Sequence, residues 1–257
     1  MKRGVKLQPN WNQELPRHWL DNNPVYTHFF NSFQMDFPGG ETHVVKSVRA
    51  YRKEINNQQL LEDIDELSRQ EAWHTKVHND YNHWLESLGY DIPATKMESK
   101  YSDLGNLAGT VAAEHFTATM SDWLNHNSDL FDKMHPHFRE IFYWHMDEES
   151  AHRAVSFDVW TSITNKIVKR HPKFKKTINR VLHKAMIRLT IEMLFYSIRN
   201  TATMLNKDKQ LFKWRTLKDL ASLLFSPKKG IILFLVKPHI DFFKEDFHPW
   251  KYAPVRI

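Results

Sequence analysis

A carboxylate and an imidazole recur three residues apart at two places in the chain. Glu71 is followed by His74, and Glu149 is followed by His152. On an α-helix, positions i and i+3 lie on one face, so each pair would present an oxygen and a nitrogen donor to the same point. Carboxylates with one His per metal suit iron or manganese better than zinc. The two pairs therefore predict a metal site.

A third Glu-x-x-His sequence, at Glu245 and His248, serves as a control for chance. Pro249 follows it directly, and the surrounding stretch has no helical periodicity. A single Glu-x-x-His is weak evidence, so we interpret this one as coincidence. The first two differ because long apolar stripes surround them.

Apolar residues at steps of three and four predict four helices that would position these pairs. A Pro38-Gly39-Gly40 break precedes the first helix, Gly89 would end the second, and Ser102 is a candidate N-cap for the third. Glu41 and Glu114 lie in the apolar stripes of the first and third helices, and the Glu-x-x-His pairs lie in those of the second and fourth. The expected helices cover residues 41–55, 57–88, 102–125 and 136–163.

Burial of four glutamates on these stripes requires compensating positive charge, because buried carboxylates are costly and repel one another. Two divalent cations would balance four carboxylates. The alternative, that these side chains are solvated, would also expose the leucines and phenylalanines that share their stripes. The predicted metal ligands are Glu41, Glu71, His74, Glu114, Glu149 and His152.

Two further histidines lie on the same helix faces, one turn from predicted ligands. His78 follows His74 by four residues, and His145 precedes Glu149 by four. We predict a catalytic role for both, as additional ligands, as partners of ligands or as proton relays; the alternative is a core histidine bonded to a backbone carbonyl. His115 and Glu148 are alternatives to their neighbours Glu114 and Glu149.

The predicted fold class is all-α, a ferritin-like four-helix bundle with additional C-terminal helices and an irregular aromatic N-terminal strap. One Glu from each of two helices with Glu-x-x-His from each of two others is the dinuclear carboxylate pattern of such bundles. The chain has only 7 Gly in 257 residues, which favours long helices over a turn-rich sheet fold. We expect a single domain, residues 1–257, with the strap at 1–38, the metal-binding core at 39–169 and buttressing helices at 172–257.

Several segments around these residues resemble a known family, the predicted metal-dependent hydrolases, a ferritin-like group of bacterial proteins. The resemblance covers about residues 25–250 and implies a ferritin-like bundle with the six metal ligands named above. The segments are SFQMDFPGGETHVV, QEAWHTKVHNDYN, AAEHFTATM, WHMDEESAHRAVSFDV and the ending FHPW.

Composition excludes several other classes of function. The chain has no Cys, which excludes disulfides, thiolate metal sites and a Cys nucleophile. Its net charge of +6 is modest and comes without a nucleic-acid-binding motif. We expect no signal peptide, no transmembrane helix and a cytoplasmic location, since the longest apolar run, 231–236, is far too short to span a bilayer. Lys228, Lys229 and Lys237 leave a membrane-surface role open for the last helices.

Three functions are compatible with this sequence. The first is a non-haem di-iron enzyme that uses dioxygen to oxidise a small organic substrate, with manganese or a mixed Mn/Fe pair as alternatives to iron. The second is a metal-dependent hydrolase that uses a metal-activated water, and the third is a non-enzymatic metal-binding protein. The sequence leaves open whether the chain forms a homodimer. An acidic electron donor or acyl carrier protein would fit the basic stretch formed by Lys169, Arg170, Lys173, Lys175 and Lys176.

Overall fold

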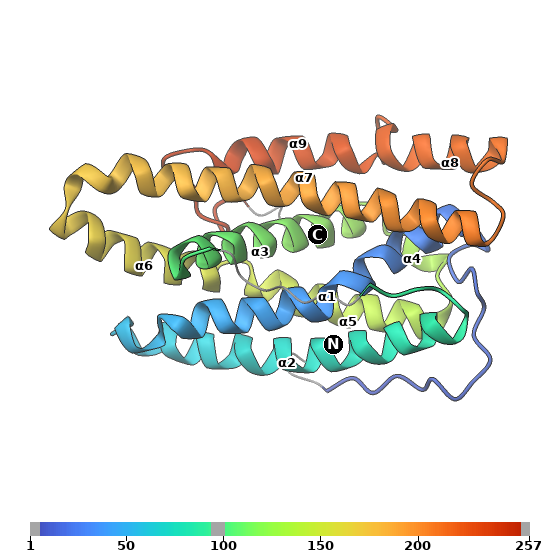
Figure 1. Ribbon diagram of the computed structural model, residues 1–257, viewed down its shortest axis with the longest axis horizontal. Coiled ribbons are helices and arrows are strands. Elements are labelled where there is room, and N and C mark those ends of the chain that lie inside the picture. The colour runs from blue at the N-terminus through green and yellow to red at the C-terminus, as the bar shows by residue number, and fades with distance from the viewer. Residues whose placement is uncertain (1–5, 94–100, 253–257) are drawn as a thin grey trace.

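The computed structural model describes residues 6–93 and 101–252 (Figure 1). These residues form helices and loops without a β-strand, apart from an isolated bridge between Leu20 and Met134, so the all-α fold class is confirmed. Short 3₁₀ turns lie at Arg52–Glu54 and Pro172–Phe174. The helices are α1 (Pro24–Ala50), α2 (Gln58–Ser87), α3 (Asp103–His126), α4 (Asp129–Asp132), α5 (Pro136–His152), α6 (Val155–Arg170), α7 (Lys175–Lys207), α8 (Trp214–Phe225) and α9 (Ile231–Phe242).

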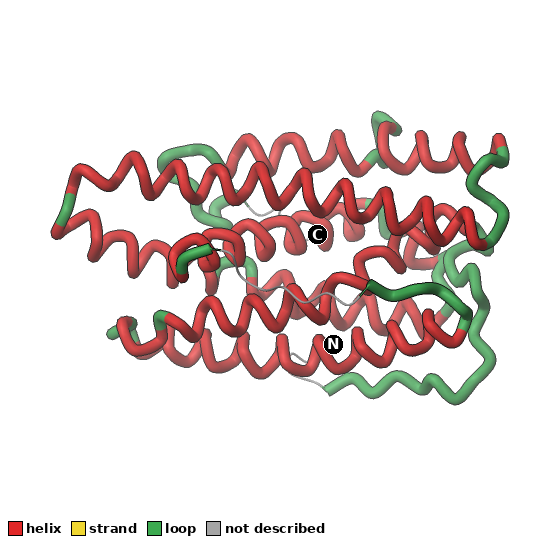
Figure 2. The backbone as a smooth tube through the Cα atoms, in the orientation of Figure 1, coloured by secondary structure: helices red, strands yellow, loops and turns green. Residues whose placement is uncertain are grey.

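The long helices run lengthwise through an elongated molecule (Figure 1). Helix α1 packs against α2, α3 and α7, and α3 also packs against α5 and α7. Helices α8 and α9 form an outer layer on the far side of α7 from α2 (Figure 1). The chain before α1 runs beside α2 as an irregular loop (Figure 2), where the Trp73 Nε1–H donates to the carbonyl oxygen of Leu7 over 2.9 Å. Within the described residues, every helix is too short or too polar to cross a bilayer.

Local signals fix the ends of α2 and α3 close to the predicted positions. The Asn57 side chain accepts a hydrogen bond from the Leu60 N–H, and the Ser102 hydroxyl accepts one from the Gly105 N–H. Both bonds satisfy N–H groups that the first helical turn leaves without intrahelical partners. Gly89 follows α2 with a φ of 87°, a conformation that suits glycine at a helix C-terminus.

The prediction that the first helix begins after Pro38 is wrong. Helix α1 starts at Pro24, where the Asn23 side chain caps it, and continues through Pro38 to Ala50, so the irregular N-terminal segment ends at residue 23. Nearly every side chain from Val25 to Met35 is buried, polar ones included. A helix that is buried on all sides shows no apolar stripe, and its packing outweighs the single backbone hydrogen bond that proline cannot donate.

The fourth predicted helix is two helices. Helix α5 ends at His152, and α6 begins at Val155 after a break at Arg153 and Ala154. The buried Arg153 guanidinium forms two hydrogen bonds with the Asp122 carboxylate of α3, at 3.0 and 3.2 Å, and its Nε–H donates to the Ser150 carbonyl oxygen. Tertiary contacts therefore accompany this break, and no proline or glycine marks it in the sequence.

Two apolar clusters form the core, one toward each end of the bundle. Helix α1 contributes Phe29 and Phe33 to the first and Val44 and Val48 to the second. Helices α2, α3 and the α5–α6 pair likewise contribute to both clusters. On each of these helices the predicted metal ligands lie between the two sets of apolar residues. The fold therefore places the polar side chains in the middle of the bundle.

Candidate metal centre

The interior between the two apolar clusters contains the six predicted metal ligands and the two histidines next to them in the helix turns, His78 and His145. Their exposed fractions lie between 0% and 6%, so all eight are buried. Helix α1 supplies one of them, α2 three, α3 one and α5 three. The residues are Glu41, Glu71, His74, His78, Glu114, His145, Glu149 and His152.

Glu71 lies at the centre of two groups of candidate ligands. Atoms of Glu41, Glu71 and His74 lie within 4.8 Å of one another, and atoms of Glu71, Glu149 and His152 do the same. The Nδ1 atom of His152 is 2.8 Å from Glu71 Oε1, and the Nδ1 atom of His74 is 3.6 Å from Glu71 Oε2. One carboxylate thus faces an imidazole from each Glu-x-x-His sequence, as a bridging ligand would.

His78 and His145 extend the cluster at Glu41. Their Nε2 atoms lie 3.1 Å and 3.7 Å from Glu41 Oε1, and the three residues form a further group of candidate ligands. His145 Nε2 also lies 3.1 Å from Glu149 Oε1. The structure therefore brings both histidines into the cluster that the sequence predicted for their neighbours.

Three of the histidines are oriented by an acceptor oxygen behind the ring. His74 Nε2 lies 2.8 Å from Glu148 Oε2, His78 Nδ1 lies 2.6 Å from Gln34 Oε1, and His152 Nε2 bonds to Gln70 Oε1. In a neutral imidazole, the nitrogen that faces an acceptor carries the proton and the other nitrogen presents a lone pair. In each case that other nitrogen faces the cluster. Such outer partners are typical of histidines that ligate metals.

The inward atoms of these histidines form no hydrogen bonds with described residues. His74 Nδ1, His78 Nε2, His145 Nε2 and His152 Nδ1 all lack a partner, although carboxylate oxygens lie close by. Buried polar atoms normally have hydrogen-bond partners. These nitrogen and carboxylate oxygen atoms lie 2.8 to 3.8 Å apart, as the ligands of a shared cation would.

Electrostatics also favours positive charge at this position. Burial raises the pKa of Glu41, and repulsion by Glu71 adds to this effect. Burial likewise raises the pKa of Glu114, with repulsion by Glu149 adding to it. Burial also opposes ionisation of Glu71, but the nearby His74 and His152 outweigh it and lower the pKa of that carboxyl. A divalent cation would relieve the burial cost and the repulsion together.

The remaining residues considered for the site, Glu114, Glu148 and His115, lie outside the groups of candidate ligands among the described residues. Glu114 is buried, but it belongs to none of the groups of candidate ligands among the described residues. Glu148 does not replace Glu149, because its carboxylate supports His74. His115 packs against Phe242 and Phe247, away from the groups of candidate ligands.

Sequence reasoning missed the residues behind the histidine rings. Gln70 and Glu148 each directly precede the glutamate of a Glu-x-x-His sequence. Gln70 on α2 supports His152 of α5, and Glu148 on α5 supports His74 of α2. Each of these two helices therefore supplies the residue that orients a candidate histidine ligand on the other helix. A polar residue immediately before each Glu-x-x-His is a signal that could have identified both.

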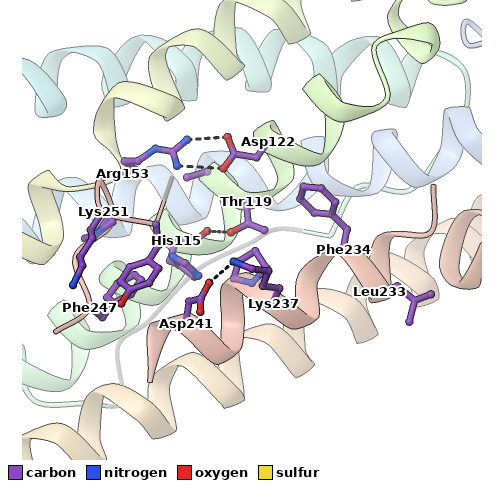
Figure 3. Close-up of a pocket in the computed structure, with 14 residues that line it drawn as sticks. His115, Thr119, Asp122, Arg153, Leu233, Phe234, Lys237, Asp241, Phe247 and Lys251 are labelled. Atoms are coloured by element: carbon purple, nitrogen blue, oxygen red, sulfur yellow. Dashed lines mark hydrogen bonds and ion pairs between the residues drawn. The ribbon is translucent and has the colours of Figure 1, made fainter. Parts of the chain in front are cut away.

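A pocket of about 620 Å³ lies between α3, α9 and the C-terminal segment (Figure 3). His115 and Arg153 line it, and each is the chain neighbour of a predicted ligand, Glu114 or His152. Figure 3 shows Arg153 paired with Asp122 on one wall. Lys237 and Asp241 of α9 form an ion pair of 2.9 Å on another wall. The pocket combines charged and apolar side chains.

A family model described as predicted metal-dependent hydrolase matches residues 3–253. The chain belongs to this family. The match confirms the resemblance seen in the sequence, and the family's description agrees with a cluster of candidate metal ligands in the interior. No curated protein and no solved structure matches the chain significantly.

Proposed function

We propose that this protein is a metal-dependent hydrolase with a dinuclear centre inside the helical bundle. The observation that carries the proposal is the convergence of buried, unpartnered imidazole nitrogens on carboxylate oxygens, with the rings of His74, His78 and His152 oriented from behind. The family description supports hydrolysis as the reaction.

The groups of candidate ligands suggest how two divalent cations would be held. Glu41, Glu71 and His74 would bind one cation, and Glu71, Glu149 and His152 would bind the other. Glu71 would bridge the pair, with Glu114 buried beside it.

His78 and His145 are assigned here as additional ligands on the Glu41 side. Burial lowers the pKa of His78, and repulsion by His145 adds to this, so the imidazole is neutral at pH 7 as a ligand must be. Phe37 packs against both rings, with centroid distances of 4.9 and 5.0 Å, and limits the access of water from that side.

Divalent cations supply a water of lowered pKa and polarise a carbonyl or phosphoryl oxygen. The chain's own part is to bind and orient the substrate. The pocket lined by His115 and Arg153 is large enough for a small organic molecule, and its paired charges, Arg153 with Asp122 and Lys237 with Asp241, suit a polar substrate.

A second candidate function is the oxygen-dependent oxidation expected of a di-iron centre. It is favoured by the order of the ligands, Glu41, then Glu71 and His74, then Glu114, then Glu149 and His152, on α1, α2, α3 and α5. This is the order of ferritin-like dinuclear carboxylate bundles, and we propose that architecture for these four helices. Iron, manganese or a mixed pair would suit the same donor set.

Metal analysis and assays on the same protein test the proposal. Protein purified without chelator is expected to contain two metal ions per chain. Manganese, zinc or ferrous iron added to metal-free protein should raise the hydrolysis of p-nitrophenyl esters or phosphoesters at least about tenfold. Rapid oxygen consumption after anaerobic loading with ferrous iron, without hydrolysis, would instead support oxidation.

Glu71→Gln is the decisive variant because it keeps the shape of the bridging residue but removes its charge. It should lose both metal ions and the metal-dependent activity. Glu245→Gln is the matched control, since Glu245 belongs to the Glu-x-x-His sequence interpreted as coincidence and is exposed. A Glu71→Gln protein that retains two tightly bound metal ions would overturn the ligand assignment.

A further inference from the structure

Apolar side chains that face solvent are concentrated on one part of the molecule. Thirteen of the seventeen exposed large hydrophobic residues in the described chain lie between Ile187 and Phe243. They belong to α7, α8, α9 and the segment before α8. Contiguous exposed apolar surface of this kind typically marks an interaction site. We call this surface the outer face, made of Ile187, Ile191, Phe195, Tyr196, Ile198, Phe212, Trp214, Leu217, Phe225, Leu233, Val236, Ile240 and Phe243.

The outer face follows helical periodicity, so it is a set of stripes rather than scattered residues. On α9, Leu233, Val236, Ile240 and Phe243 recur at steps of three and four, opposite the buried Ile231, Leu235 and Phe242. On α8, Trp214, Leu217 and Phe225 form a similar stripe. Both helices thus bury one apolar face in the protein and present a second apolar face to solvent.

The three helices adjoin one another. Helices α8 and α9 are in contact and lie along the same side of α7 (Figure 1). The Thr190 hydroxyl of α7 lies 2.8 Å from His239 Nε2 of α9, and the ring of His183 packs against Phe243. The stripes of α7 and α9 therefore lie side by side.

Positive charge is concentrated beside these stripes. Residues 207–229 contain seven Lys or Arg and two Asp, a net charge of +5 against +6 for the whole chain. All seven basic residues are exposed. Asp208 pairs with Arg17, outside this segment, over 2.8 Å, and Asp219 accepts a hydrogen bond from Asn23 over 2.8 Å and lies 3.8 Å from Arg215.

We propose that the outer face binds the surface of a membrane that contains anionic lipids. Exposed Trp and Phe residues interleaved with Lys and Arg are the features of helices that lie in the bilayer interface. Phe212 and Trp214 are 85% and 80% exposed and are flanked by Lys213 and Arg215. These aromatic rings would enter the interface while the basic side chains contact lipid headgroups.

The positive charge beside the outer face favours a lipid surface over a second copy of this chain as the binding partner. Two copies joined through this face would bring the basic segments 207–229 together, and like charges across an interface are unfavourable. An anionic bilayer complements both the charge and the apolar stripes. The proposal does not depend on the metal centre, and its test measures no catalytic activity.

Co-sedimentation of the full chain with lipid vesicles tests this proposal. We expect binding to vesicles of phosphatidylcholine with phosphatidylglycerol, at least about tenfold weaker binding to phosphatidylcholine alone, and weakening by salt. The double variant Phe212→Ser with Trp214→Ser should weaken binding at least about tenfold. Lys213→Glu with Lys218→Glu should do the same.

Phe174→Ser is the matched control, because Phe174 is also exposed, at 42%, but lies outside the outer face. It should bind vesicles as the unaltered chain does. Highly exposed positions were chosen so that the variants fold, which circular dichroism can check. The proposal is overturned if anionic vesicles are not bound, if both lipid compositions are bound equally, or if the chain is a dimer that Trp214→Ser dissociates.

Discussion

Buried charges in this protein fall into two kinds at the level of single residues. Several carboxylate oxygens of the candidate metal centre have no hydrogen-bond partner among the described residues, whereas Asp208 is fully bonded. Its carboxylate accepts hydrogen bonds from Arg17, His18, His28 and Tyr90, at 2.8 to 2.9 Å. His18, His28 and Asp208 also have the geometry of a metal site, but Arg17 already neutralises the carboxylate. We therefore interpret this cluster as structural.

Asp208→Asn should destabilise the fold by about 2 kcal/mol near pH 7, because it leaves buried donors without a charged acceptor. Burial opposes ionisation, but the hydrogen bonds from His28, His18 and Tyr90 outweigh it and lower the pKa of Asp208. A lowered pKa stabilises the folded state above the ordinary value near 4 and loses this effect as the pH falls. The difference from the unaltered chain should therefore shrink as the pH falls below about 4.

Denaturant unfolding at several pH values measures this difference. Asp91→Asn is the control, because Asp91 has a side chain that is 98% exposed and lies 3.9 Å from Lys207. It should have little effect at any pH. A loss of stability in Asp208→Asn that stays constant down to pH 3 would show that the carboxylate charge is unimportant.

At the scale of helices, the same arrangement of residues recurs on α1, α2 and α3. Each helix has apolar residues of one core cluster, then acidic or imidazole groups, then apolar residues of the other cluster. The apolar segments bury the helix at both ends, so the polar residues between them are buried as well. The cost of burying these charges is thus imposed by the packing of whole helices.

Substitution by alanine should change the free energy of unfolding in opposite directions at two glycines. Gly89 has a φ of 87°, and a Cβ there would be strained even though the space is open, so Gly89→Ala should cost about 1 kcal/mol. Gly40 lies inside α1, and a Cβ there would meet nothing within 4 Å. Gly40→Ala should therefore stabilise the protein by about 0.5–1 kcal/mol. Equal effects of both substitutions on the free energy of unfolding would contradict this explanation.

For the molecule as a whole, the proposed metal centre would link metal binding to folding. Bound cations stabilise the folded state by mass action. Removal of metal by a chelator should lower the midpoint of thermal unfolding by about 5–10 °C, since a kcal/mol corresponds to roughly 2–4 °C in a chain of this size. Calorimetry with and without chelator measures the shift.

The effect of the chelator should also depend on pH. Burial raises the pKa of Glu41 and Glu114 in the metal-free protein. A raised carboxyl pKa stabilises the folded state at low pH, and this contribution is lost as the pH rises through the raised value. The chelated protein should therefore lose more stability between pH 5 and pH 8 than the metal-loaded protein. Identical melting curves with and without chelator at both pH values would argue against a bound metal.

The sequence alone predicted an all-α fold, the extents of α2 and α3, and the residues that converge in the interior. These features follow from periodicity, because a stripe of apolar residues fixes which side of a helix is buried. Burial of Glu71, His74, Glu114 and Glu149 was therefore predictable from their neighbours on the same helices.

Only the tertiary structure decided where α1 begins, where α5 ends and which side chains form hydrogen bonds that orient the histidines of the cluster. The first half of α1 is buried on all sides and so has no stripe, and the break after His152 accompanies a salt bridge between Arg153 and Asp122. Gln70 and His152 are 82 residues apart in the chain. Contacts between such distant residues depend on how whole helices pack, and local periodicity carries no information about them.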